Sequence, residues 1–420
     1  MAGDFRKGPP AAPEDKAVGE SGKHEKDCNR GGAPVTILFM PPLTDTRILD
    51  LSRLLPGPYA TQLLADLGAE VIKIETPRLG DYARIAPDTI GGDAMFRMIN
   101  RGKKSVALNY RNKQGREIFL KLAETADVII ETFKPGSMDR WEIGYEAAKK
   151  RNPGIIYCSI SGYGQTGPYR DRVGHDLTYI AIAGLLGLTG EPGGPPSPPG
   201  IQTADLGAAT FAALNILAAM LERGRTGEGR HLDVAMLDPV VHWTVPTIGS
   251  EYFGTGTLPS RGRLPLTGGW PSNRVYRTRD DRYLALAALE PPFWSEFCRI
   301  VDRPDLLPSA FDEDAIPEVE GILLQRTQAE WLALFEGIEI PLEPVLNYEE
   351  MLAHPQVQVR GLIRPSEDGG IPELHSPFPF PPAEGGPPAL GQHTGEILTQ
   401  AGYSPDEISA WNAAQVIRIW

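Results

Sequence analysis

The sequence has little cysteine, no excess of positive charge and no long uninterrupted apolar run. Its three cysteines among 420 residues lie in unrelated contexts, which excludes a disulfide framework and a metal-site spacing and favours a reducing compartment. The net charge of −13 argues against nucleic acid or an anionic membrane as the main partner. No apolar stretch approaches the ~20 residues of a membrane span, and the N-terminus lacks the apolar core of a signal peptide. We therefore expect a cytoplasmic protein.

The segments that follow residue 42 alternate between strand and helix patterns. Residues 1–42 mix Gly, Pro, Lys and Glu with few large apolar groups, so they are expected to form a disordered leader. Strand, helix, strand order is then predicted in "TRILDLSRLLPGPYATQLLADLGAEVIKIE" and again in "KSVALNY", "RNKQGREIFLKLAETA" and "DVIIETF", followed by the strand "GIIYCSISGYG". This alternation predicts an α/β fold with a parallel, Rossmann-like sheet, whose ligands bind beyond the carboxyl ends of the strands.

The length of the chain favours more than one domain. We expect a large Rossmann-like domain over 43–240, a linker over 241–267 and a smaller α+β domain over 268–365. The smaller domain is predicted from the strand pattern "NRVYRTRDDRYLALAAL" and the helix patterns "PPFWSEFCRIV" and "TQAEWLALFEGI". Residues 366–420 are expected to return to the large domain, with a helix that starts at Ser404.

Three titratable positions stand out as candidates for chemistry. His175 opens the apolar stretch "VGHDLTYIAIAGLLGL", Asp205 lies where a long small-residue helix is expected to begin, and Glu290 ends the strand pattern "YLALAALE" before two prolines. Each has an ordinary structural explanation, as a core or capping histidine, a helix N-cap and a solvated strand end. Asp205 also lies beside free backbone N–H groups at the positive end of a helix dipole, where an oxyanion is stabilised.

Several long segments, in the same order, resemble the family III CoA-transferases of the CaiB/BaiF type, which include the α-methylacyl-CoA racemases. The resemblance runs from about Arg47 to the C-terminus and includes "DLSRLLPGPYATQLLADLGAEVIKIE", "NRGKKSVALN", "VIIETFKPGSMDRWEIGY", "SGYGQTGPYRDRVGHD", "TADLGAA", "GEGRHLDVAMLD" and "LGQHTGEIL". It implies a CoA-binding large domain and a small domain in an interlocked homodimer. It also implies an acyl-CoA substrate and no separate cofactor or metal.

This family carries out two reactions. In the transferases, a carboxylate at the position of Asp205 attacks the thioester and forms an aspartyl-CoA species. In the racemases, the matching Asp works with a His and a Glu that correspond to His175 and Glu290. Because all three racemase positions are present, we expect epimerisation at C2 of a 2-methylacyl-CoA. CoA transfer between carboxylic acids is the alternative, and a CoA-binding protein without turnover is the third hypothesis.

In the racemase hypothesis, His175 and Asp205 act as acid and base on opposite faces of C2. Glu290 orients His175 and stabilises its imidazolium. The enolate oxygen needs hydrogen-bond donors, for which the candidates are the N–H groups at the start of the Asp205 helix and those around Gly174 to Asp176.

The remaining candidates are contacts to CoA. The basic cluster of Arg97, Arg101, Lys103 and Lys104 is either a solvated surface or the site that binds the phosphates of CoA. Thr76 stands where the racemases have an arginine, so that contact is missing or is supplied by another residue such as Arg78. The full set of expected CoA-binding residues, most of them by resemblance, is Thr76, Arg97, Arg101, Lys103, Ala107, Leu108, Asn109, Tyr110, Thr132, Phe133, Lys134, Arg140, Gly174, Asp176 and Tyr179.

Removal of residues 1–42 should leave the melting temperature and the activity almost unchanged, because this segment lacks the apolar content to join a core. Thermal unfolding and turnover of the full and shortened chains test this expectation. A loss of many degrees on truncation would mean that the leader packs on the body.

Overall fold

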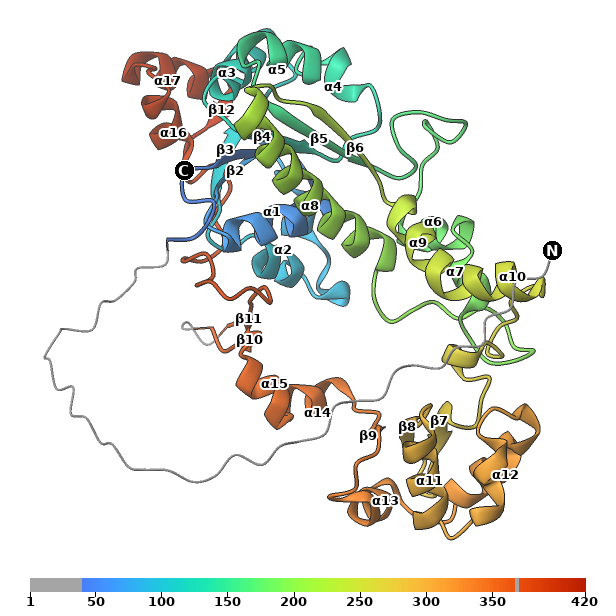
Figure 1. The fold of residues 1–420 in the computed structure, drawn as a ribbon. Helices are drawn as coiled ribbons and strands as arrows, with labels where there is room; N and C mark the ends of the chain where they lie inside the picture. The colour runs from blue at the N-terminus through green and yellow to red at the C-terminus, as the bar shows by residue number, and fades with distance from the viewer. Residues whose placement is uncertain (1–39, 367–369) are drawn as a thin grey trace, which may run out of the picture. The chain divides into compact units, whose positions relative to one another are not determined.

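The computed structural model describes residues 40–366 and 370–420, so residues 1–39 of the expected leader over 1–42 lie outside the described residues. The central element is a seven-stranded sheet in the order β12-β3-β2-β1-β4-β5-β6 (Figure 1). Its strands are β1 Arg47–Asp50, β2 Glu70–Glu75, β3 Lys104–Leu108, β4 Val128–Glu131, β5 Ile156–Ser161, β6 His231–Ala235 and β12 Ile417–Arg418.

Six of these strands are parallel, and only the edge strand β12 runs antiparallel to its neighbour β3. The order β3-β2-β1-β4-β5-β6 is that of the Rossmann fold, in which the chain reverses its direction of sheet growth between β1 and β4. The prediction of an α/β fold with a parallel sheet is confirmed. All seven strand and helix patterns quoted for residues 46–164 correspond to elements of this sheet and its helices.

Alternating side chains of the strands enter two separate cores, one on each face of the sheet. Ile48 packs in one core and Leu49 in the other, as the two-residue period of a strand requires. One face is covered by α3 Lys113–Ala123, α5 Tyr145–Arg151, α16 Thr394–Gln400 and α17 Pro405–Ala413. The other is covered by α1 Pro56–Asp66 and α8 Thr203–Thr226 (Figure 1).

Residues 273–344 contribute a second, three-stranded antiparallel sheet in the order β7-β8-β9. Its own apolar core contains Trp294, Phe297 and Trp331. The elements here are β7 Asn273–Arg277, β8 Tyr283–Ala287, β9 Leu342–Pro344, α11 Pro291–Ile300, α12 Ile316–Leu323 and α13 Gln328–Phe335. The strand and helix patterns predicted for this part of the chain are thus present.

The remaining elements are short. They are α2 Ala94–Ile99, α4 Ser137–Arg140, α6 Asp176–Ile182, α7 Leu185–Leu188, α9 Leu237–Thr244, α10 Ser250–Thr255, α14 Tyr348–Ala353, α15 Pro355–Arg360 and the hairpin of β10 Ile363–Arg364 with β11 Glu373–Leu374. At α17 the hydroxyl of Ser404 accepts the N–H of Glu407, and the carboxylate of Glu407 accepts the N–H of Ser404. The helix start predicted at Ser404 is therefore confirmed.

Helix α8 begins earlier than its sequence predicts. It starts at Thr203, so Asp205 is its third residue, and the cap residue Gln202 makes no side-chain capping bond. The ordinary explanation of Asp205 as an N-cap is therefore wrong. Among the described residues α8 is also the one helix with the length and apolar composition of a membrane span, but 44% of its apolar window is buried in the protein and a core helix meets the same test.

Candidate active site

A cavity of about 350 Å³ lies where the strand order reverses. It is lined by Arg53 and Leu54 after β1, by residues 132–135 after β4, by residues 161–162 at the end of β5 and by Met236 after β6. Ligands of Rossmann folds bind at this switch point, beyond the carboxyl ends of the strands. The cavity is therefore the candidate active site.

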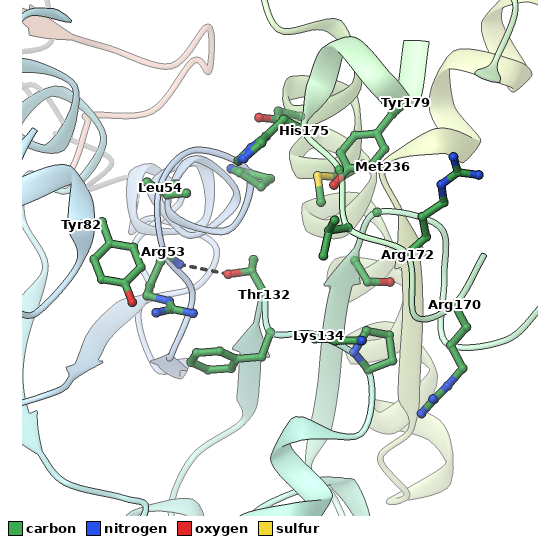
Figure 2. A pocket seen from close by; sticks show the side chains of 18 residues that line it. Arg53, Leu54, Tyr82, Thr132, Lys134, Arg170, Arg172, His175, Tyr179 and Met236 are labelled. Carbon is green, nitrogen blue, oxygen red and sulfur yellow. Dashed lines mark hydrogen bonds between the residues drawn. The ribbon is translucent and has the colours of Figure 1, made fainter. Parts of the chain in front are cut away.

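His175 and Asp205 both line this cavity, and they come from different helices. His175 directly precedes α6, and Asp205 is in the first turn of α8. His175 and Tyr179 lie on one side of the cavity, and Arg53 and Tyr82 lie on the other (Figure 2). The structure thus brings together two of the three predicted catalytic residues.

The carboxylate of Asp176 joins the starts of these two helices. Its Oδ1 atom accepts the backbone N–H of Ala204 at 2.7 Å and that of Asp205 at 3.1 Å. Asp176 therefore performs the capping of α8 that no residue before the helix provides. It thereby binds two of the N–H groups that were expected to stabilise an oxyanion at the start of α8, those of Ala204 and Asp205.

The backbone at His175 is fixed by its own helix. The Thr178 hydroxyl accepts the N–H of His175 at 3.1 Å and donates to the His175 carbonyl at 2.7 Å. A Cβ atom at Gly174 would lie 2.6 Å from both the Thr178 hydroxyl and the Tyr179 ring, so only glycine allows this close approach. The backbone from which the imidazole of His175 extends is consequently held at one place on the cavity wall.

Asp205 has the perturbed acidity expected of a functional carboxyl. Burial, and then the negative charge of Asp176, raise the pKa of Asp205 to about 7. The nearby carboxylate of Asp205 in turn adds to the effect of burial in raising the pKa of Tyr179. At neutral pH Asp205 is therefore present in both its protonated and its ionised form, as a group that gives and takes a proton requires.

The loop after β1 is held in an unusual conformation on the cavity wall. Leu54 has a φ of 64°, in the left-handed region that disfavours a branched side chain. Its N–H donates to Asp81 Oδ1 at 3.0 Å, and Asp81 pairs with Lys73 at 2.9 Å. The N–H of Arg53 donates to Thr132 Oγ1 at 3.1 Å, which ties the loops after β1 and β4 together (Figure 2).

Beneath this loop lies a fully buried set of charges. Asp50, at the end of β1, lies 3.9 Å from Lys73 and 3.5 Å from Lys103, and all three side chains are inaccessible to solvent. Burial alone would raise the pKa of Asp50, but the two lysines lower it below its usual value, so it is ionised. Burial lowers the pKa of Lys103 to about 7.

Arg53 connects the first cavity to a second one of about 730 Å³. Its guanidinium lies between two rings, 4.8 Å from the centroid of Tyr82 and 4.6 Å from that of Phe133. Arg53 and Tyr82 line both cavities. The second is lined by four arginines and no carboxylate among the described residues: Arg53, Thr76, Pro77, Arg78, Leu79, Tyr82, Asn109, Arg111, Asn412, Gln415, Ile417 and Arg418.

Seven of the expected CoA contacts, together with the proposed substitute Arg78, fall into two groups by cavity. Thr132, Phe133, Lys134, Gly174 and Tyr179 line the first, and Thr76, Asn109 and Arg78 line the second. Asp176 lines neither, because its carboxylate caps α8. Arg97 in α2 and Arg140 in α4 are also absent from both linings, and Arg140 donates to Ser137.

The expected basic phosphate cluster is not a cluster on the surface. The buried guanidinium of Arg101 makes an ion pair with Asp66 at 2.5 Å and donates to two carbonyl groups of the C-terminal segment. The buried ammonium of Lys103 donates to Asn100, Thr61 and the Pro58 carbonyl. Lys104 pairs with Glu70 and Glu396. These cations hold the framework together, and burial removes Arg101 and Lys103 from any phosphate.

Three further expected contacts are buried. Ala107 and Leu108 are inside the sheet with no exposed surface, and Tyr110 packs against Phe133 and Trp141. Their side chains are therefore part of the core and do not line either cavity.

Glu290 does not line the cavity that holds His175 and Asp205. It is exposed at the start of α11 and makes no ion pair with any residue that the structure describes. The chain as it stands therefore brings only two of the three predicted catalytic residues together. The described ranges also contain no group of three or more His, Cys, Asp or Glu side chains that could hold a metal ion.

Sequence reasoning missed five cations that line the two cavities, Arg53, Arg111, Arg170, Arg172 and Arg418. Arg53 and Arg111 follow the ends of β1 and β3, so the rule for ligands of parallel sheets could have found them. Arg418 has no local signal, since it reaches its cavity only through the pairing of β12 with β3.

Comparisons with known proteins agree with this architecture. A family model described as CoA-transferase family III matches residues 43–394. The chain is 35% identical to human succinyl-CoA:glutarate CoA-transferase, over 86% of each chain. It is 31% identical to human alpha-methylacyl-CoA racemase, over 88% of this chain and 96% of the relative. A crystal structure of a CAIB/BAIF family protein from Brucella suis matches 86% of this chain and 99% of its own, with 30% identity and a TM-score of 0.74.

Asp205→Asn should become more stable relative to the wild type as the pH rises. Because folding raises the pKa of Asp205, ionisation of this group destabilises the folded state between the ordinary Asp pKa of ~4 and about 7. The asparagine lacks this penalty. The difference in melting temperature should therefore be small near pH 4.5 and should grow toward pH 8. The matched control is Asp406→Asn, at an exposed carboxylate in the first turn of α17. An equal rise in both variants would contradict the perturbed acidity of Asp205.

Proposed function

The chain belongs to CoA-transferase family III, and we propose that it epimerises C2 of a 2-methylacyl-CoA thioester by two-base proton transfer. The observation that carries this proposal is that His175 and Asp205 reach one cavity from the starts of two different helices. Two bases on separate elements can lie on opposite faces of one carbon atom. That arrangement is what inversion at C2 requires.

In the proposed reaction one base removes the proton from C2, and the electron pair moves into the thioester carbonyl to give an enolate. The other residue, in its acid form, then returns a proton to the opposite face, so atoms and charge balance and the two residues exchange roles. A pKa of about 7 suits Asp205 to both roles. The enolate oxygen needs donors other than the N–H groups of Ala204 and Asp205, which Asp176 already binds. Of the donors expected around Gly174 to Asp176, the N–H of His175 is bound by Thr178, so we propose the N–H groups of Gly174 and Asp176 for this role.

The two connected cavities suit the two ends of an acyl-CoA. The cavity with His175 and Asp205 takes the thioester, and the cavity with four arginines takes the polyanionic end of CoA. The stacked guanidinium of Arg53 stands between them. Arg78 and Arg418 offer positive charge where Thr76 replaces the arginine of the racemases. CoA enters as part of the substrate, and no separate cofactor is needed for this chemistry.

A second copy of the chain is proposed to supply Glu290. This carboxylate is exposed and lies outside the cavity of its own chain, whereas the resemblance assigns it a role beside His175. Large apolar side chains are exposed on α6, α8, α9 and α10: Leu177, Ile182, Leu214, Leu221, Trp243 and Phe253. Apolar surface of this extent favours a protein interface, and a homodimer would cover it.

CoA transfer between carboxylic acids is the alternative function. Several relatives carry transferase names, among them the human protein at 35% identity. Lys134, Arg170 and Arg172 also line the cavity of Asp205, and cations there would suit a substrate with a second carboxylate. In this alternative Asp205 attacks the thioester carbonyl, and the thiolate of CoA is transferred through an aspartyl-CoA species. For either activity we propose a cytoplasmic location, with neither nucleic acid nor a membrane as partner.

Incubation of the protein with 2-methylacyl-CoA in D2O, with and without a free carboxylic acid, separates the two reactions. The racemase incorporates deuterium at C2 without an acceptor acid. His175→Ala should abolish epimerisation but retain exchange from one enantiomer, and Asp205→Asn should retain exchange from the other. Each loss should be at least ~10²–10⁴-fold in epimerisation rate. Since Asp205 must be ionised to act as a base, exchange through Asp205 should rise as the pH increases through about 7.

The opposite outcome has its own signature. A transferase loses all turnover in Asp205→Asn and shows no deuterium at C2. Hydroxylamine would then inactivate the wild type only in the presence of acyl-CoA, because it traps a carboxyl-bound intermediate. That result would replace the racemase proposal with the alternative.

The proposed dimer predicts twice the chain mass of 45.7 kDa in light scattering, even at low protein concentration. Leu221→Glu, at an exposed position of α8, should weaken the dimer and lower activity. The matched control is Lys150→Glu, at an exposed position of α5 on the other face of the sheet. A monomer that is fully active would contradict both the dimer and the proposed role of Glu290.

A further inference from the structure

The carboxylate of Asp176 makes its hydrogen bonds to a different helix from the one to which it belongs. The carboxylate belongs to the first residue of α6, but it accepts hydrogen bonds from two residues of α8, Ala204 and Asp205. The partners lie 28 and 29 positions further along the chain. His175 immediately precedes Asp176, so one short side chain connects the two residues proposed to carry out the chemistry.

We propose that Asp176 is a positioning residue, which ties the start of α6 to the start of α8 and so sets the placement of His175 relative to Asp205. The inference rests on the proposed function, because it takes His175 and Asp205 as the two reacting groups. It goes beyond that function in giving Asp176 a task other than contact with CoA.

The geometry leaves little freedom of movement between the start of α6 and the start of α8. A carboxylate that accepts two adjacent N–H groups at a helix start has little freedom to rotate, and the positive end of the α8 dipole favours its charge. The same loop is restricted at Gly174, where a Cβ atom would collide with Thr178 and Tyr179. His175 therefore cannot move along the cavity wall without breaking the bonds of either Thr178 or Asp176.

The tie also acts on Asp205 through charge. Burial raises the pKa of Asp205 most, and the negative charge of Asp176 raises it further. A neutral side chain that still accepts the two N–H groups would keep the placement and remove this charge. The role of Asp176 as a cap and its role as a neighbouring charge can thus be separated by substitution.

Other titratable groups surround Asp205 and must stay unchanged in such a test. Helix α8 packs against α1, α6, α9, β5 and β6. Besides Asp176 itself, the titratable and charged groups of these elements and of the cavity wall are Tyr59, Asp66, His175, Tyr179, Asp238, His242, Tyr157, Cys158, His231, Asp233, Arg53, Tyr82, Lys134, Arg170 and Arg172.

Two neutral capping residues, Asp176→Asn and Asp176→Ser, give the first part of the experiment. Both retain an acceptor for the N–H groups of α8, so either one suffices if the other fails to fold. In a His175→Ala background only Asp205 removes the C2 proton, and the rate of deuterium exchange against pH reports its ionisation. The pH at half-maximal exchange should move to lower values in both variants, because the repulsion that disfavours ionised Asp205 is gone. Asp238→Asn, in the first turn of α9, is the matched control and should leave the profile in place.

Asp176→Ala tests the placement. It removes the acceptor and should lower the rate by about 10²-fold at the optimal pH, as expected for a displacement of about 1 Å between reacting groups. Asp176→Asn should retain most of the rate at its own optimum. A wild-type rate in Asp176→Ala would overturn the placement of His175 by Asp176. A role limited to helix capping predicts that the pH profile of Asp176→Asn does not move, and that outcome would overturn the effect of its charge on Asp205.

A measurement without substrate distinguishes this inference from the proposed function. The gain in melting temperature of Asp205→Asn from pH 4.5 to pH 8 is compared in the wild-type and Asp176→Asn backgrounds. A smaller gain in the second background supports the coupling even if no exchange at C2 is ever observed. Equal gains in the two backgrounds would overturn it, whichever reaction the protein performs.

Discussion

The ionised carboxylate of Asp50 is the constraint on which the cavity wall depends. It lies at the end of β1 with no exposed surface, and isolated burial of such a charge is very unfavourable. Lys73 and Lys103 compensate it from the neighbouring strand and loop, and Thr61 donates to it from α1 at 2.7 Å. Because each partner belongs to a different segment, the loop after β1 can adopt one arrangement only. Lys73 also pairs with Asp81, and Asp81 accepts the N–H of Leu54, whose backbone is strained, on the cavity wall. Such a cluster is weak evidence for stability but a good reason for a unique geometry at this site.

A second unfavourable arrangement sits on the opposite wall. Asp176 and Asp205 bring two carboxyl groups to one helix start, and the dipole of α8 can only partly offset their repulsion. A protein selected only for stability would have little reason to keep both. The arrangement gives a carboxyl group that changes protonation near neutral pH, which an isolated aspartate on the surface does not do. Unfavourable electrostatic arrangements thus stand on both walls of this cavity.

The sequence predicts the architecture well because the sheet obeys local rules. The buried strands β1 to β5 are short apolar runs between turn signals, and the amphipathic helices between them have the expected period, so the parallel α/β core follows from the pattern alone. The position of the cavity follows from the strand order. The burial of Arg101 and Lys103 could not be predicted, because their partners Asp66 and Asp50 lie in other elements of the fold. The capping role of Asp176 could not be predicted either, because its partners are on α8. Nor could the sequence predict that Glu290 lies outside the cavity of its own chain. The sequence pattern identifies which residue types lie near a site. Only the contacts of the folded chain decide which charged side chains form buried ion pairs and which face a ligand.

The pairing of β12 with β3 has a consequence for how the molecule is made. Ile417 and Arg418 complete the sheet edge beside Leu108 and Ala107, and Arg418 completes one wall of the arginine-lined cavity. A ribosome adds ~5–20 residues per second, so the roughly 300 residues between these partners take on the order of 15–60 s to synthesise. During that interval the edge of β3 is unpaired and resembles the exposed strand edges from which aggregates grow. The nascent chain thus passes through a period of exposure to chaperones and to other copies of itself, and its arginine-lined cavity is complete only when that exposure ends.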